Sequence, residues 1–157
     1  MDQIAGDGGR TSLFSGGFSV SEAFEGSEAI AAARGLARSF LTDAQAVHGL
    51  PVSGRAMGMV QLVVSELVTN ARKYAPGPCL LTMQVEGGVV EVTVWDSSTA
   101  LPAVLGPDPG RVGQHGLEIV MAVCQSFKVQ RELVGKRITA AVVLVDDPGD
   151  DVAGRRA

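Results

Sequence analysis

The segment from Leu80 to Asp96 constrains the fold more than any other part of this 157-residue chain. It reads LLTMQVEGGVVEVTVWD, in which apolar and polar residues alternate on both sides of a Gly87-Gly88 pair. Alternation of this kind is typical of a half-buried strand, and a two-residue glycine turn is typical of a tight hairpin. Val85 then faces Val90, and the apolar rows of both strands lie on one face. The segment therefore predicts an antiparallel sheet that needs cover on one side.

Two segments with helical periodicity precede the hairpin and can supply that cover. The first, residues 26–47, repeats apolar residues at helical spacing, with Ser27 as the expected N-cap. The second begins at a Ser53 cap and is ended near Tyr74 by the Pro-Gly-Pro run that starts at Pro76. We therefore expect two helices packed on the sheet.

The remaining segments complete the order of elements. Residues 13–21 are a strand candidate weakened by glycines, and residues 97–116 form an aperiodic stretch rich in glycine and proline, typical of a lid or a binding loop. Residues 116–127 resume helical periodicity, and residues 128–145 predict two strands around Gly135. The order indicates an α+β fold, a two-layer α/β sandwich whose mixed, mostly antiparallel sheet carries its helices on one face.

Composition indicates one domain without a membrane segment. The chain is 46% hydrophobic, enough for a single core, which we expect over residues 11–145 between a disordered leader (1–10) and a flexible tail (146–157). A net charge of -4 provides no general field for nucleic acid or an anionic membrane. The two cysteines lack the spacing of a zinc site or a disulfide framework. We expect a cytoplasmic protein that binds neither nucleic acid nor membrane.

The last turns of the second helix, SELVTNARKYA, place polar side chains where an apolar stripe should continue. At about 100° per residue, Glu66 and Asn70 fall in the middle of the stripe, with Lys73 beside Glu66. A buried amide without partners costs roughly 1 to 3 kcal/mol, and a buried carboxylate costs more. One interpretation is a structural network in which Glu66 pairs with Lys73 and Asn70 caps a loop carbonyl. The other is a cavity where a hard metal ion and a phosphate meet the helix end.

Two further segments carry candidate binding groups. Asp96 ends the buried row of its strand, where its carboxylate can accept a hydrogen bond from an exocyclic amine or cap the next loop through an Asx turn. Trp95, on the opposite strand face, is expected to pack under a helix. The stretch GQHGLEIV places Gly113 and Gly116 directly before a helix, whose free N–H groups attract anions.

Together these segments resemble the GHKL superfamily of gyrase, chaperone, histidine-kinase and mismatch-repair ATPases, whose nucleotide-binding domain is the Bergerat fold. ELVTNARKYA is similar to its N box, VWDSS stands where its first glycine box falls, and GQHGLEIV where its second one does. The resemblance covers about residues 18–144, and the N box is its most specific part. The short length, the helical N-terminal half and SELVTNA are most similar to the bacterial anti-sigma-factor serine/threonine kinases and their actinobacterial relatives.

The resemblance implies that the cofactors are ATP and Mg²⁺ and assigns a role to each candidate residue. Asn70 would coordinate the Mg²⁺ that bridges the phosphates, and Glu66 would be the general base that accepts a proton from the attacking hydroxyl. Lys73 would contact phosphate, Asp96 would bind the adenine amine, and Thr139 would support adenine through water. The residues that would wrap the phosphates beneath a lid are Gly113, His115, Gly116 and Leu117.

The sequence departs from the family pattern in both glycine boxes. Asp96 is followed by Ser97 and Ser98 instead of the usual glycines, and the second box has Gly-Gln-His-Gly-Leu where Gly-X-Gly-Leu is usual. Both changes are expected to weaken ATP binding, because glycine lets the backbone approach the ligand closely.

The resemblance implies an ATP-binding regulatory protein that acts as an anti-sigma-factor-like serine/threonine protein kinase. It would phosphorylate an antagonist protein and, in another complex, sequester a sigma factor. One alternative is a catalytically silent ATP-binding module that regulates a partner by binding, and another is a domain of this fold with a dead pocket. A homodimer is common in the resembled family, and the sequence leaves the oligomeric state open.

Overall fold

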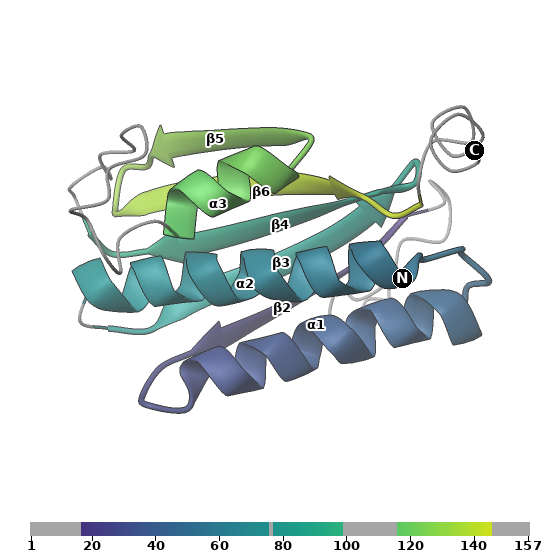
Figure 1. The fold of residues 1–157 in the computed structure, drawn as a ribbon. Coiled ribbons are helices and arrows are strands. Elements are labelled where there is room, and N and C mark those ends of the chain that lie inside the picture. The colour runs from purple at the N-terminus through teal and green to yellow at the C-terminus, as the bar shows by residue number, and fades with distance from the viewer. Residues whose placement is uncertain (1–16, 76, 99–115, 146–157) are drawn as a thin grey trace.

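The computed structural model describes residues 17–75, 77–98 and 116–145. Within these ranges, three helices cover one face of a five-stranded sheet (Figure 1). The strands are β2 (Phe18–Phe24), β3 (Cys79–Glu86), β4 (Val89–Asp96), β5 (Ser126–Arg131) and β6 (Lys136–Val143). The helices are α1 (Ala29–Ala46), α2 (Gly54–Tyr74) and α3 (Gly116–Val123). The strand order is β2-β3-β4-β6-β5, and every neighbouring pair is antiparallel, which confirms the predicted fold class.

The hairpin of β3 and β4 forms in the expected register. Val85 pairs with Val90, and the turn residues Gly87 and Gly88 have φ angles of 64° and 79°. Side chains rarely tolerate this left-handed region, which is why two glycines occupy the turn. The buried row that the two strands share faces the helices. Its members are Leu81, Met83, Val85, Val90, Val92 and Val94.

The helix ends were predicted with different success. Ser53 caps α2, accepting a hydrogen bond from the Ala56 backbone N–H at 3.0 Å, and the helix ends at Tyr74 as expected. The expected Ser27 cap of α1 is wrong, because Glu28 occupies the N-cap and makes no side-chain cap hydrogen bond. The backbone carbonyl of Gly26 instead accepts from the Ala29 N–H at 3.2 Å. A backbone turn thus satisfies a donor that a serine side chain was expected to satisfy.

Helix α2 lies between α1 and α3 and packs its apolar stripe on the sheet (Figure 1). Val63 and Leu67 are fully buried near the middle of this stripe. Glu66 and Asn70 are only half-buried, so the expectation that they occupy the middle of the stripe is wrong. They lie on its flank, where α2 meets α3. No helix among the described residues is both long and apolar enough to span a bilayer.

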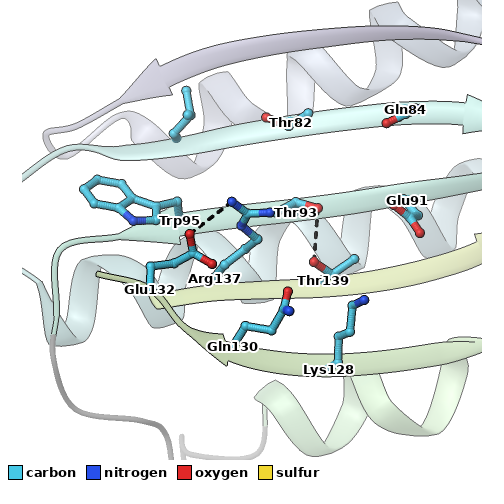
Figure 2. Close-up of a pocket in the computed structure, with 11 residues that line it drawn as sticks. Thr82, Gln84, Glu91, Thr93, Trp95, Lys128, Gln130, Glu132, Arg137 and Thr139 are labelled. Atoms are coloured by element: carbon cyan, nitrogen blue, oxygen red, sulfur yellow. Dashed lines mark hydrogen bonds and ion pairs between the residues drawn. The ribbon is translucent and has the colours of Figure 1, made fainter. Parts of the chain in front are cut away.

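The opposite face of the sheet is not covered by the described helices, and it forms a shallow cavity of about 540 Å³ (Figure 2). Trp95 lines this cavity, so its expected place under a helix is wrong. Its indole N–H donates to the Val134 carbonyl at 2.8 Å. Thr139 also lines the cavity, with its hydroxyl 3.2 Å from the Thr93 hydroxyl. By strand alternation it points away from the face that carries Asp96, and so it cannot support a base bound there.

Candidate functional site

The start of α3 meets α2 at Glu66. A Cβ atom added to Gly116 would overlap the Glu66 Oε1 atom and would lie 3.3 Å from its Cδ. Glycine at position 116 therefore leaves the space that the Glu66 carboxylate occupies. The next residue, Leu117, is 9% exposed and belongs to the hydrophobic core, so it fixes α3 beside the carboxylate. The fold thus brings together two of the segments that the sequence singled out.

Asn70 carries an unsatisfied acceptor one helical turn after Glu66. Its Oδ1 atom is buried and has no hydrogen-bond partner, the one such side-chain atom in the described part of the chain. An orphaned buried acceptor costs about 1 to 3 kcal/mol, so native proteins rarely leave one without a functional reason. A carbonyl-type oxygen is also the kind of ligand that hard cations prefer. The Asn70 side chain therefore fits the expected role of a cation ligand.

The described residues do not form a complete metal cage around Asn70. They contain no group of three or more His, Cys, Asp or Glu side chains that could hold an ion. Mg²⁺ commonly takes only one or two protein ligands and completes its octahedron with water and substrate phosphates. The donor set near Asn70 is therefore consistent with an ion that arrives together with a phosphate ligand.

Lys73 does not satisfy Glu66. The Lys73 side chain is exposed, and its ammonium lies 5.4 Å from the centroid of the Tyr74 ring. Among the described residues it forms no ion pair with Glu66, so the structural network that the sequence allowed does not form between these two side chains. The Glu66 carboxylate lies at the junction of α2 and α3, beside Gly116.

Asp96 ends the buried row of β4 as expected, but its carboxylate is already paired. Lys136 lies opposite it in the ladder between β4 and β6 and donates to Oδ2 at 2.7 Å and to Oδ1 at 3.0 Å. The Ser98 backbone N–H also donates to Oδ1, at 2.8 Å, which is the loop cap that the sequence allowed. Asp96 and Lys136 are each 1% exposed, so the pair is buried.

Sequence reasoning missed Lys136, although the pattern contained a signal. Lys136 lies on the same face of β6 as Ile138, Ala140 and Val142, and this face is turned toward the helices. A cation that begins a buried row needs an anionic partner on the neighbouring strand. Asp96 occupies the matching position at the end of β4, so the pairing could have been found once the two strands were known to be neighbours.

The buried pair lies beside the end of α2. The Lys136 ammonium is 5.9 Å from the centroid of the Tyr74 ring. Burial raises the pKa of the Cys79 thiol, and the negative charge of Asp96 raises it further, while a backbone hydrogen bond and the Arg72 charge lower it. The three sequence segments singled out for binding therefore meet near the C-terminal half of α2.

Comparison with known proteins identifies the family. Residues 27–142 match the family model described as the histidine kinase-like ATPase domain. The chain belongs to this family. No curated protein matches it.

Two solved structures are similar to this histidine kinase-like ATPase domain. The structure of the RsbU and RsbW domains of Rv1364c from Mycobacterium tuberculosis matches with a TM-score of 0.59 and 17% identity, over 82% of this chain and 34% of that one. The histidine kinase domain of the blue-light activated histidine kinase from Erythrobacter litoralis EL346 matches with a TM-score of 0.46 and 18% identity, over 71% of this chain and 60% of that one. This chain therefore spans less than two thirds of either, and the first likeness shows the fold alone.

Membership of the ATPase family implies nucleotide binding, and the described residues fit that ligand in part. Asn70 offers an unpartnered oxygen, and Gly116 leaves room for the Glu66 carboxylate. Asp96 does not present a vacant carboxylate, since Lys136 holds both of its oxygens. Gly113 and His115 lie outside the described residues. Two cavities of about 540 and 410 Å³ lie on the uncovered sheet face and between β2 and α1, and Glu66, Asn70 and Asp96 line neither.

Proposed function

We propose that this domain binds ATP with Mg²⁺ and transfers the terminal phosphoryl group to a serine or threonine of a small antagonist protein, as an anti-sigma-factor-like kinase. In another complex it would sequester a sigma factor. The observation that carries the proposal is the buried Asn70 Oδ1 atom without a partner, one helical turn from the Glu66 carboxylate. The similarity of SELVTNA to the anti-sigma-factor kinases supports the choice of reaction and partner.

Each residue of the site has a defined task in this proposal. Asn70 would hold the cation through its side-chain oxygen, and Lys73 at the exposed end of α2 would contact a phosphate. Glu66 would accept the proton of the acceptor hydroxyl, because its carboxylate is half-buried, lies against Gly116 and is not paired with Lys73. When bound, ATP with Mg²⁺ supplies the phosphoryl group and neutralises the charge of the phosphates. Phosphoryl transfer asks mainly for such positioning, so a sparse site suffices.

A nucleotide titration with and without Mg²⁺ tests the binding step. ATP at about 100 times its dissociation constant should stabilise the fold by about 2.7 kcal/mol, read as a rise in the melting temperature. The rise should require Mg²⁺ and should be lost in Asn70→Ala. Thr69→Ala serves as the matched control, because Thr69 is exposed on the same helix and its hydroxyl donates to the Ser65 carbonyl. A wild-type melting temperature that ATP and Mg²⁺ leave unchanged would refute the proposal.

A transfer assay with labelled ATP and candidate antagonist proteins tests the kinase step. Glu66→Gln should keep Mg²⁺-dependent ATP binding while transfer falls by a factor of about 10² to 10⁴, the usual contribution of a general base. Glu86→Gln, which removes an exposed carboxylate at the end of β3, is the control and should transfer at the wild-type rate. Transfer that survives Glu66→Gln unchanged would contradict the assigned base.

A catalytically silent ATP-binding module is the second candidate, and the paired state of Asp96 favours it. Because Lys136 already holds the Asp96 carboxylate, nucleotide binding would have to change this ion pair, and a partner protein could recognise that change. The two candidates differ in their dependence on Glu66. Full regulatory activity in cells carrying Glu66→Gln, together with its loss in Asn70→Ala, would favour the module over the kinase.

A further inference from the structure

The ion pair between Asp96 and Lys136 opposes the role expected of Asp96. Lys136 donates to both carboxylate oxygens, at 2.7 and 3.0 Å, and the Ser98 backbone N–H donates to Oδ1. A carboxylate has about four acceptor positions, so these three hydrogen bonds use most of them. Both residues are 1% exposed. A ligand amine therefore cannot reach Asp96 while Lys136 keeps its place.

Lys136 has another place to which its ammonium can move. The Tyr74 ring lies 5.9 Å from the ammonium, at the limit of a cation–π contact, and the Tyr74 side chain is 49% exposed. A lysine side chain is a flexible four-carbon stem, so its ammonium can leave the carboxylate without movement of the β6 backbone. Movement toward Tyr74 would bring the charge to partial hydration and uncover the acceptor positions of Asp96.

We propose that Lys136 acts as a latch on the base subsite, competing with the exocyclic amine of a purine nucleotide for Asp96. This inference rests on the proposed function, because it concerns the base-binding end of the same site. Each base that hydrogen-bonds Asp96 must first displace the ammonium. The exocyclic amine then forms one hydrogen bond to the carboxylate, and the protein loses the hydrogen bonds from Lys136. Because these two effects oppose each other, the amine contributes little to the affinity of the wild-type protein.

If Lys136 competes for Asp96, the affinity of the wild-type protein should depend little on the 6-amino group of the base. Wild-type protein with Mg²⁺ should bind ATP and purine riboside 5′-triphosphate, which lacks the 6-amino group, with dissociation constants within about threefold of each other. In Lys136→Met the carboxylate has no competing cation, so ATP should bind more tightly by roughly ten- to a hundredfold, the effect of one hydrogen bond to a charged group. Binding of the analogue should change by less than about threefold.

The matched control is Arg137→Met. Arg137 is the next residue of β6, lies on the opposite sheet face and pairs with the Glu132 carboxylate at 3.2 Å. This variant removes one positive charge from the same strand without touching Asp96, so both dissociation constants should stay at wild-type values. Lys136→Gln provides a second variant if Lys136→Met fails to fold, because its neutral amide still donates to the carboxylate. It should raise the preference for ATP by about threefold or more.

Isothermal titration calorimetry of the full chain with both triphosphates measures the dissociation constants that test this competition. A wild-type preference for ATP over the analogue above about thirtyfold would overturn the latch, because Lys136 would then not compete. The latch is also overturned if the preference is the same in wild type and in the Lys136 variants, or if ATP binds these variants more weakly. In each of these cases the nucleotide still binds, so the proposed function stands. No binding of either triphosphate to any variant would instead refute the proposed function.

Discussion

Replacing Gly116 by alanine should damage the site while leaving the fold intact. The added Cβ would overlap Glu66 Oε1, 3.3 Å from Cδ and 3.6 Å from Cβ of the same side chain. All three nearest atoms belong to Glu66, and the closest is the free end of a flexible side chain. The carboxylate must therefore rotate away from the start of α3.

The structure allows the size of the two opposing effects to be compared. A displaced rotamer of Glu66 costs on the order of 0.5 to 1.5 kcal/mol. Alanine in place of a helical glycine gains up to about 1 kcal/mol. The free energy of unfolding should therefore fall by at most about 1.5 kcal/mol, a shift of at most about 6 °C in melting temperature. Phosphoryl transfer should nevertheless fall by a factor of about 10² to 10⁴, because the proton acceptor is misplaced.

The assay combines urea unfolding with single-turnover transfer, and Gly58→Ala is the control. Gly58 lies in the same helix as Glu66 and is exposed, with nothing within 4 Å of an added Cβ, so its variant should gain up to about 1 kcal/mol and keep full transfer. In a double-mutant cycle, the Gly116→Ala/Glu66→Ala protein should lose less stability than the sum of the two single losses, because removal of the carboxylate removes the overlap. Wild-type transfer by Gly116→Ala, or a loss above about 3 kcal/mol in its unfolding free energy, would show that the overlap with Glu66 does not act as described.

Three further outcomes follow from the same contacts. Lys136→Met should lower the free energy of unfolding, measured in urea, by about 3 to 5 kcal/mol, because it leaves the buried Asp96 carboxylate without its cation. A loss below about 1 kcal/mol would contradict the pairing. Gly135→Ala should lower the melting temperature more than Gly88→Ala. Both glycines have positive φ angles (82° and 79°), but of the two only a Cβ at position 135 would overlap a backbone carbonyl, that of Asp96. Equal melting temperatures would show that this overlap is harmless. Burial raises the pKa of the Cys124 thiol from 9.0 to about 11. Alkylation of the folded protein by iodoacetamide should therefore be slow at pH 8 and should accelerate about tenfold per pH unit until the pH reaches that pKa. Fast labelling at pH 8 would contradict this.

Much of the fold could be predicted because it depends on local patterns. The Gly87-Gly88 turn and the alternation around it determine the register of β3 and β4, and the pairing of Val85 with Val90 confirms it. Ser53 and the proline at position 76 likewise mark both ends of α2, because a cap and a helix breaker act within one turn. The local rule failed at Ser27, where a backbone carbonyl satisfied the first helical donor.

The candidate site was predictable in its residue types more than in its contacts. The N-box residues Glu66 and Asn70 stand out in the sequence as polar groups on an apolar helix, yet helical periodicity placed them in the middle of the buried stripe. Helical periodicity shows which side chains lie on the same side of the helix. The positions of the sheet and of α3 around that helix determine which of these side chains are most deeply buried. Their roles as base and cation ligand stay predictions that the proposed experiments test.

The order of elements, the antiparallel hairpin, the limits of α2 and the N-box residues could all be inferred from local sequence, because each depends on neighbours within a few positions of the chain. The packing of Gly116 on Glu66, the place of Trp95 on an uncovered sheet face and the pairing of Lys136 with Asp96 emerged only from the folded structure. These contacts join segments distant in sequence, and their free energies depend on burial and geometry that exist only once the sheet has assembled.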